Sequence, residues 1–132
     1  EADNMQIHQS AEDYLETILM LTQRMGRVRS IDVVNELGYT KASVSIAMKK
    51  LRENGYIAVD GEGNLTLLEP GREIAERIYS RHRLLTHFFV QLGVDEEVAA
   101  EDACKAEHIL SEQTLEKIRE YALLHDAQDS VK

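Results

Sequence analysis

The stretch TKASVSIAMKKLRENGYI, residues 40–57, decides the fold of this chain. Its apolar residues recur at the three- and four-residue spacing of an amphipathic helix, and Thr40 is a residue type that favours a helix N-terminus. The predicted helix begins near Thr40 and ends at Asn54-Gly55, because this dipeptide interrupts the helical period. The predicted core positions are Val44, Ala47, Met48 and Leu51.

A shorter helix is predicted immediately before this stretch. Ser30 is its predicted N-cap, and the apolar spacing continues through Ile31, Val33, Val34 and Leu37 until Gly38 ends the helix. Two short helices separated by a tight turn that contains glycine predict a helix-turn-helix.

Extended structure is predicted directly after Gly55. Residues 56–59 and 65–68 are apolar runs, and they flank the turn residues DGEGN at positions 60–64. This pattern is typical of a β-hairpin. A helix-turn-helix followed by a hairpin is a winged helix with a two-stranded wing.

One more helix is predicted before the winged helix and three after it, so the fold class is mainly α. Ser10 followed by Asp13 resembles a capping box that opens a helix through about Met25. Leu15, Ile18, Leu19 and Thr22 are its predicted apolar face.

The three later helices follow the wing. Pro70 suits the first turn of a long helix over residues 71–92, Asp95 caps a second, and Ser111 caps a last helix through about Leu124. The final residues, HDAQDSVK, are expected to be frayed. The predicted apolar stripe of the long helix is Ile74, Ile78, Leu85, Phe88 and Leu92.

Composition indicates a globular chain of one core or two small subdomains. The 132 residues are 43% hydrophobic and 30% charged, and no apolar run approaches the length of a membrane span. The N-terminus lacks a signal peptide pattern, and Met5 is the expected native start. A single cysteine cannot form an internal disulfide, so a cytoplasmic location is expected.

The predicted third helix is basic in an acidic chain. The whole chain has a net charge of -9, whereas residues 40–54 contain four basic residues against one acid. A polyanion such as DNA is bound by locally clustered lysine and arginine, which makes this helix a candidate recognition helix. A solvated helix surface is the alternative, and the predicted wing favours DNA. The candidate DNA-binding residues are Thr40, Lys41, Ala42, Ser43, Ser45, Lys49 and Lys50.

The segment ACKAEHIL, residues 103–110, carries the only cysteine. Residues three and four apart share one face of a helix, so Cys104, Glu107 and His108 are predicted to project together. Ala103, Ala106, Ile109 and Leu110 are predicted to cluster on the opposite face. The thiol therefore lies on the polar face, outside the apolar stripe of its own helix.

Further donors occur on two other predicted helices. Asp13 and Glu16 point away from the apolar stripe of the first helix, and His82 lies beside the stripe of the long helix. Each has an ordinary explanation, which is a helix-dipole contribution for the acids and a boundary position for the histidine. Together with the trio they form a mixed set of nitrogen, oxygen and sulfur donors that suits a first-row divalent metal. A zinc ribbon is excluded because it needs more cysteines.

The whole pattern resembles the diphtheria toxin repressor and manganese transport regulator family of metal-dependent bacterial repressors. The similarity extends from Ser10 to about Tyr121. It is carried by SAEDYLETILML (10–21), KASVSIAMKKLRENGYI (41–57), SRHRLLTHFF (80–89) and EDACKAEHILS (101–111).

This resemblance implies a homodimer with a winged-helix DNA-binding domain over residues 1–70 and a helical metal-binding and dimerisation domain over residues 71–132. It implies the short, two-domain manganese-type form. The family's ligand positions fall on Asp13, Glu16, His82, Cys104, Glu107 and His108.

The ligand set is a hybrid of the two branches of the family. Iron-responsive members resemble this chain at Cys104, and manganese-responsive members resemble it at Asp13. Hard carboxylates suit Mn²⁺ or Fe²⁺, whereas a thiolate favours Fe²⁺, Co²⁺, Ni²⁺ or Zn²⁺. The favoured cofactor is Mn²⁺ or Fe²⁺, and one or two ions per subunit both remain open. The ancillary site of the iron branch is also open, because Thr86 and Ala100 replace its acid and its second histidine, with His87 and Glu101 close by.

The expected function is repression of metal-homeostasis genes by a dimer that binds double-stranded operator DNA when metal is bound. Two other classes of function remain open. One is a metal-independent winged-helix regulator in which Cys104 is a redox switch. The other is a metal-dependent enzyme with Glu16 as general base, for which the sequence offers no substrate pocket motif and leaves the basic helix unexplained.

Overall fold

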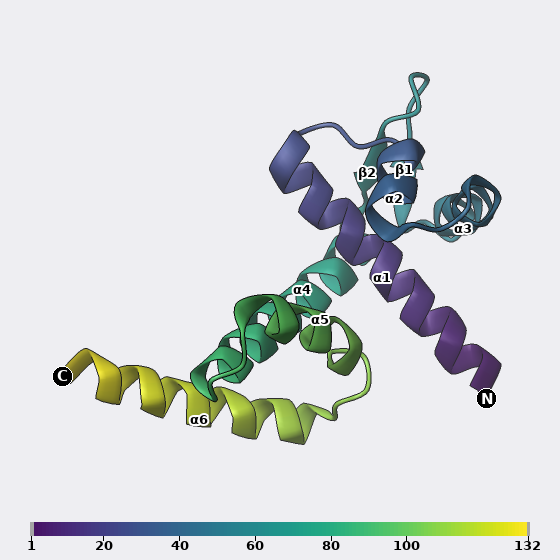
Figure 1. Ribbon diagram of the computed structural model, residues 1–132. Helices are drawn as coiled ribbons and strands as arrows, with labels where there is room; N and C mark the ends of the chain where they lie inside the picture. Colours follow the sequence, from purple (N-terminus) through teal and green to yellow (C-terminus); the bar gives the residue numbers. More distant parts are fainter. Residues whose placement is uncertain (1, 132) are drawn as a thin grey trace. The chain divides into compact units, whose positions relative to one another are not determined.

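The computed structural model describes residues 2–131, and within them the side chains of residues 9–128. The elements in chain order are α1 (Ala2–Met25), α2 (Ser30–Leu37), α3 (Lys41–Glu53), β1 (Ile57–Val59), β2 (Leu65–Leu67), α4 (Glu69–Gln91), α5 (Glu96–Ala106) and α6 (Glu112–Val131) (Figure 1). They form two units, the first ending at Arg77 and the second beginning at Ile78. None of the helices in this described part combines the length and hydrophobicity that a membrane span requires.

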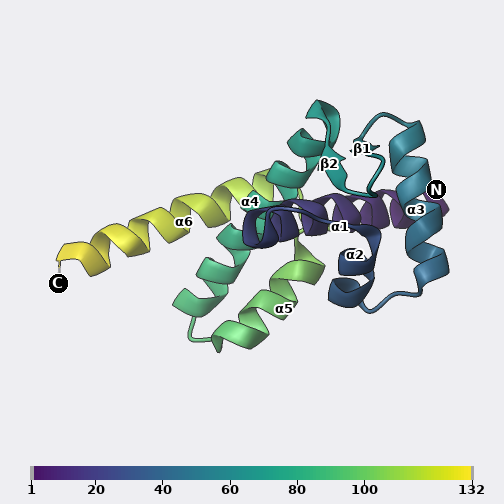
Figure 2. The same cartoon turned by 90° about the horizontal axis from the view of Figure 1, so that it is seen from above.

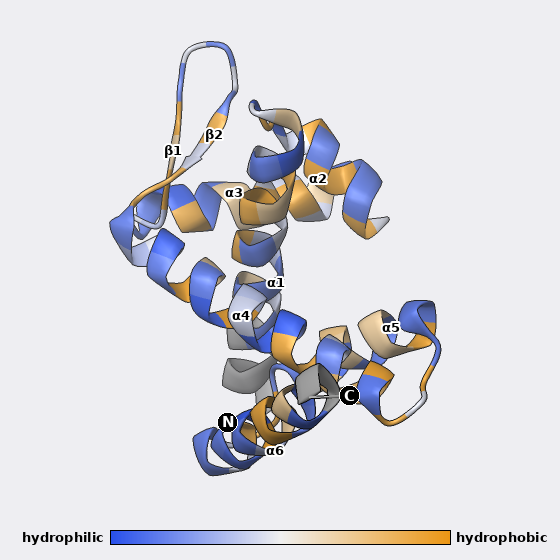
Figure 3. Ribbon diagram, turned by 90° about the vertical axis from the view of Figure 1, so that its left-hand side faces the viewer, coloured by the Kyte–Doolittle hydropathy of each residue, from blue (hydrophilic) through white to orange (hydrophobic). Residues whose placement is uncertain are grey.

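The first unit contains the predicted winged helix. Helices α2 and α3 pack against each other, α1 contacts α2 and β2 (Figure 2), and β1 pairs with β2 in antiparallel register from Ile57↔Leu67 to Val59↔Leu65. Hydrophobic and hydrophilic residues are mixed along α2 and α3 (Figure 3), as amphipathic helices require. The buried residues of this core include Leu15, Ile18, Leu21, Val28, Val33, Val44, Met48, Leu51, Ile57 and Leu65.

The turn before α3 is defined by a glycine and a threonine. Gly38 follows α2 with a φ of 72°, a left-handed conformation that glycine adopts without steric cost, and its N–H donates to the Val34 carbonyl oxygen at 2.8 Å. Thr40 is the N-cap of α3, where its hydroxyl oxygen accepts the Ser43 N–H at 3.1 Å. The predicted start of this helix is confirmed, and its first turn is capped by the Thr40 hydroxyl.

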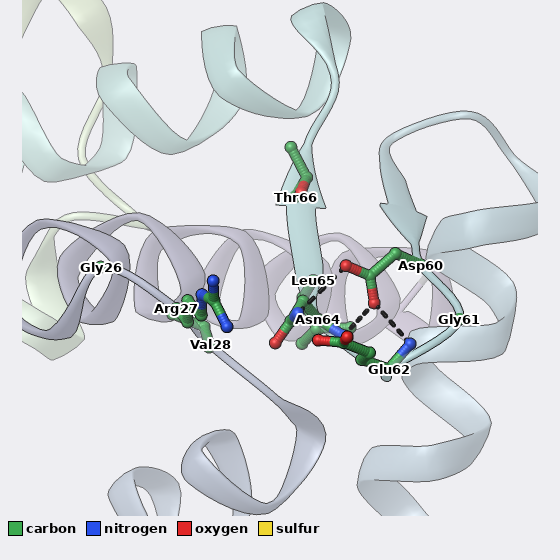
Figure 4. A pocket seen from close by; sticks show the side chains of 9 residues that line it. All are labelled: Gly26, Arg27, Val28, Asp60, Gly61, Glu62, Asn64, Leu65 and Thr66. Carbon is green, nitrogen blue, oxygen red and sulfur yellow. Dashed lines mark hydrogen bonds between the residues drawn. The ribbon is translucent and has the colours of Figure 1, made fainter.

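The tip of the wing is closed by one carboxylate. Asp60 accepts the backbone N–H groups of Glu62 and Asn64, both at 2.9 Å, and the Asn64 side-chain amide at 3.0 Å. These hydrogen bonds favour the charged carboxylate, and the backbone N–H of Asn64 contributes most to lowering the pKa of Asp60. A pocket lies beside this turn and is lined by residues 26–28, 60–62 and 64–66 (Figure 4). Its lining includes none of the predicted metal ligands.

Helix α4 leaves the wing through a close contact at Gly71. A Cβ atom at this position would overlap the carbonyl oxygen of Tyr56 and lie 3.3 Å from Leu15 Cδ2. Gly71 is buried in the first turns of α4, next to Pro70. The absence of a side chain therefore lets the backbone of α4 lie directly against the start of the wing.

The second unit packs the later part of α4 against α5 and α6. Leu85, Ala103 and Leu115 are its buried centre, one from each helix. The side chains that pack around this centre are Leu84, Phe89, Ala106, Leu110 and Ile118. Ser111 caps α6 as predicted, because its hydroxyl oxygen accepts the Thr114 N–H at 3.2 Å.

The predicted ends of α1, α2 and α6 were wrong. Helix α1 begins at Ala2, so Ser10 lies inside it and is not an N-cap. The N-cap of α2 is Arg29 rather than Ser30, because the Arg29 N–H donates to the Asp32 carboxylate at 2.9 Å. Helix α6 continues to Val131, so the tail that was expected to be frayed is helical, and its Asp126 contacts His87 of α4.

Four predicted apolar positions were also wrong, and one of them is Ile31 at the start of α2, which is 42% exposed. Thr22 is exposed and donates its hydroxyl to the Ile18 carbonyl oxygen at 2.7 Å. Leu92 lies just after α4 and is 59% exposed, and Ile109 lies in the turn after α5 and is 70% exposed. In the last two cases the helix ends before the residue, so the helical period no longer fixes its direction.

Candidate metal centre

Three of the predicted ligands meet in the second unit. His82 lies on α4 and Cys104 on α5, and Glu107 is the C-cap residue of α5. One ligand atom of each lies within 4.8 Å of the other two. His82 Nδ1 is 3.1 Å from Glu107 Oε2 and 3.8 Å from Cys104 Sγ. An imidazole, a thiol and a carboxylate therefore converge around one point.

His108 extends this cluster on the other side of Glu107. Its Nε2 lies 3.5 Å from Glu107 Oε1, and both side chains are buried. Each carboxylate oxygen of Glu107 thus faces one imidazole. The second unit brings together all four of the ligands predicted from residues 71–132.

The end of α5 explains how these residues share one side. The helix ends at Ala106, so Glu107 and His108 lie in the following turn rather than on the helix as the sequence predicted. Glu107 keeps right-handed helical angles, φ -60° and ψ -24°, and its N–H donates to the Ala103 carbonyl oxygen at 2.9 Å. The helical phase therefore continues through Glu107, which keeps it beside Cys104.

The thiol and the carboxylate differ in their access to solvent. Cys104 is exposed, as its predicted place on the polar face of α5 requires, whereas Glu107 is fully buried. A buried carboxylate needs a hydrogen-bonded or charged neighbour to offset its lost hydration. The two imidazoles are such neighbours, and a divalent cation held by the same atoms is a stronger one. The donor set fits a first-row transition metal.

Asp13 and Glu16 belong to the first unit, on α1. Asp13 is half-buried and Glu16 is buried. Tyr14, between them, is also buried and contacts Tyr39 edge to face with ring centroids 5.9 Å apart. Burial, and then the neighbouring Tyr39 and Asp13, raise the pKa of Tyr14. The contact between Tyr14 and Tyr39 links α1 to the residue that precedes Thr40, the N-cap of α3.

The other histidine of α4 has a different partner. His87 Nε2 lies 2.9 Å from Asp126 Oδ1 on α6, and the Gln91 side-chain amide donates to the same oxygen at 2.8 Å. Among the residues described, His87 and Glu101 are in none of the groups whose ligand atoms are close enough to share an ion. The structure accounts for His87 as a contact between two helices.

The predicted DNA-binding face of α3 is open. All seven candidate residues, from Thr40 to Lys50, are exposed, while Val44, Met48 and Leu51 on the other face are buried in the winged-helix core. The basic side chains are thus separated from the core by the amphipathic character of one helix. This is the arrangement in which a recognition helix contacts phosphates and base edges.

A winged helix with an open basic recognition helix, joined to a helical unit with clustered metal-ligating side chains, is the organisation of a metal-dependent transcriptional regulator. Family comparison agrees with this class. Residues 6–65 match the N-terminal DNA-binding domain of the iron-dependent repressors, and residues 68–124 match their metal-binding and dimerisation domain. The chain belongs to the iron-dependent repressor family. The sequence motifs had already indicated a resemblance to this family.

Individual relatives agree with this membership. The chain is 36% identical over 113 residues to an uncharacterised helix-turn-helix transcriptional regulator of Methanocaldococcus jannaschii, covering 84% of this chain and 90% of that protein. It is 32% identical over 123 residues to the transcriptional regulator MntR of Bacillus subtilis, covering 93% and 87%. Both relatives are regulators of transcription.

Solved structures share the fold. A manganese-dependent transcriptional repressor in complex with manganese superposes with a TM-score of 0.78 at 28% identity, covering 85% of this chain. The structure described as T. acidophilum IdeR has a TM-score of 0.77 at 24% identity, and this similarity concerns the fold alone. The present chain spans 52% of the length of each of these two proteins.

Sequence reasoning missed one residue beside the cluster. Arg81 precedes His82 on α4, and its guanidinium donates to the Glu107 backbone carbonyl oxygen at 3.2 Å and pairs with the Glu112 carboxylate of α6. The only sequence signal was its place within SRHRLLTHFF. Nothing in that motif indicates that its partner is a main-chain carbonyl 26 residues later.

Proposed function

We propose that this chain is a homodimeric repressor of metal-ion homeostasis genes, which binds operator DNA when Mn²⁺ or Fe²⁺ is bound. The observation that carries the proposal is the convergence of His82, Cys104 and Glu107 within the domain that the family uses for metal binding and dimerisation. The similarity to a manganese-bound repressor supports Mn²⁺. The thiol of Cys104 supports Fe²⁺ and leaves Co²⁺, Ni²⁺ and Zn²⁺ as further candidates.

The proposed ligands are Asp13, Glu16, His82, Cys104, Glu107 and His108. The four residues of the second unit are supported by their mutual distances. Asp13 and Glu16 are supported by the chemistry of two carboxylates three residues apart on one helix, and by the motif that they share with the family. We propose that all six serve the same centre.

Metal binding and DNA binding are coupled in this proposal. A bound divalent cation supplies positive charge that offsets the repulsion among the carboxylates. Asp13 and Glu16 belong to the DNA-binding unit, whereas the other four ligands belong to the dimerisation unit. Shared coordination would restrict the two recognition helices of the dimer to the spacing of successive major grooves. Operator and metal would then strengthen each other's binding by the same factor.

The proposed DNA contacts are the seven exposed residues at positions 40–50 named above. We propose residues 1–70 as the DNA-binding domain and residues 71–132 as the metal-binding and dimerisation domain. We also propose that the protein acts in the cytoplasm, where operator DNA and a reducing environment occur together.

One specific observation favours a second candidate. Cys104 is an exposed thiol beside an imidazole, and such a thiol could report oxidation rather than metal. That regulator would keep its DNA affinity in the presence of a chelator and lose it with peroxide. An enzyme, in contrast, would turn over a substrate in the absence of DNA. We propose a regulatory and non-catalytic role for the metal because the relatives are transcriptional regulators.

The test is a DNA-binding assay with controlled metal. A binding sequence is first selected from a random duplex pool in the presence of Mn²⁺, and its fluorescence anisotropy is then followed during titration with Mn²⁺, Fe²⁺, Co²⁺ or Zn²⁺. Bound metal is counted in the same samples. We expect metal to strengthen binding, and Glu107→Ala to remove that response. DNA binding that no metal changes would contradict the proposal.

A further inference from the structure

Arg81 connects the three helices of the second unit at one point. It lies on α4, its Nη1 donates to the carbonyl oxygen of Glu107 at 3.2 Å, and its Nη2 pairs with the carboxylate of Glu112. The arginine side chain is 15% exposed, whereas that of Glu112 is 81% exposed. The Arg81 side chain is therefore largely buried, and its guanidinium joins the end of α5 to the start of α6.

The two contacts of Arg81 suit the helix ends that they join. Glu107 caps α5, where the carbonyl groups of a helix end carry partial negative charge, and a guanidinium is favourable there. Glu112 is in the first turn of α6, where a carboxylate is favourable. Arginine presents several donors in a fixed planar arrangement, so one side chain can satisfy both partners.

The residue held by Arg81 is the centre of the metal cluster. Glu107 directs one carboxylate oxygen to His82 and the other to His108, at 3.1 and 3.5 Å. Arg81 is also the direct chain neighbour of His82. A hydrogen bond from Arg81 to the backbone of Glu107 therefore fixes the separation between two ligands that come from different helices.

We infer that Arg81 is a positioning residue for the metal centre, which sets metal affinity by holding the turn of Glu107 and His108 against α4. The inference rests on the proposed function, since it assigns Arg81 a role toward the ion that these ligands would bind. Groups that orient metal ligands contribute about 10- to 100-fold to affinity in other proteins. We expect a loss near the lower end of this range, because Arg81 acts through the backbone rather than on a donor atom.

The experiment follows Co²⁺ binding by absorption in the full chain. Thiolate and ligand-field bands report coordination by Cys104 and its geometry, independently of DNA. Arg81→Met keeps the length and apolar packing of the side chain but removes its donors. Arg119→Met is the matched control, because Arg119 forms an exposed ion pair with Glu116 on α6.

Arg81→Met should weaken Co²⁺ binding by about 10-fold and speed hydrogen exchange of the amides of residues 107–110 in the metal-free protein. Arg81→Lys should recover part of the affinity, since an ammonium can still donate to the carbonyl. Glu112→Gln, at an exposed side chain, should give a smaller loss and serves as the test if Arg81→Met does not fold.

The outcomes separate the inference from the proposed function. Wild-type Co²⁺ affinity in a folded Arg81→Met chain overturns the positioning role, and so does an equal loss of affinity in Arg119→Met. If Arg81→Met does not fold, an unchanged affinity in Glu112→Gln alone overturns it. A wild-type chain that binds Co²⁺ without a thiolate band would contradict the proposed ligand set instead.

Discussion

Replacing Gly71 with alanine should destabilise the winged-helix unit, although alanine is the better helix former. The added Cβ would overlap the Tyr56 carbonyl oxygen, lie 3.1 Å from the Tyr56 carbonyl carbon and 3.3 Å from Leu15 Cδ2. The backbone of Tyr56 is itself held by two hydrogen bonds. Its carbonyl oxygen accepts the Leu68 N–H at 2.9 Å, and its N–H donates to the Leu51 carbonyl oxygen at 2.9 Å.

The magnitude follows from two opposing effects. Glycine to alanine within a helix stabilises by at most about 1 kcal/mol. Overpacking of a tight interior costs about 1–3 kcal/mol, and a clash with backbone belongs at or above the upper end. The cost of the clash therefore exceeds the gain in helix propensity, and the free energy of unfolding should fall by about 2 kcal/mol in Gly71→Ala.

Urea unfolding of the metal-free chain, followed by circular dichroism, measures this change. Gly61→Ala is the control, because no heavy atom lies within 4 Å of its added Cβ and its φ is not left-handed. The control should change the free energy by no more than about 0.5 kcal/mol. A Gly71→Ala chain as stable as the wild type would show that α4 does not pack this closely on the wing.

Three further predictions concern the metal, the DNA and the wing. Cys104→Glu should lower the affinity for Co²⁺ relative to Mn²⁺ by at least about 10-fold and remove the thiolate band. Competition titrations in which the ratio of the Co²⁺ and Mn²⁺ affinities stays unchanged would refute Cys104 as a ligand. Lys50→Gln should reduce the slope of log affinity against log salt by about 0.9 if it contacts one phosphate, and an identical slope would exclude that contact. Asp60→Asn should remove a pH dependence of wing stability. The pKa of Asp60 is lowered by folding, so its contribution is present above the unfolded pKa and is lost as pH falls below about 4. Thermal unfolding at neutral and acidic pH measures this, and equal acid sensitivity in the two chains would count against it.

Periodicity predicted the elements well because each helix of the winged-helix unit buries one face. The spacing of Val44, Met48 and Leu51 fixed both the type of element and the side that enters the core, and all three are buried. Helix ends were harder to predict, because a cap residue such as Ser10 is equally compatible with a helix interior. The contact between the extended part of α6 and α4 joins His87 and Asp126, which are 39 positions apart, and no local pattern carries that information.

The metal cluster shows the same division between local and tertiary information. Cys104, Glu107 and His108 are close in sequence, so helical geometry alone could place them together, even though the helix ends before Glu107. His82 has an ordinary role as a boundary residue beside an apolar stripe, so it could be added only as one donor of a set and through the family motif that contains it. Arg81 could not be predicted, because its partner at Glu107 is a carbonyl group, which every residue has. The donors of a metal site are thus chemically distinctive in a sequence, whereas the groups that hold those donors in place often act through the backbone and become visible only when the helices are packed.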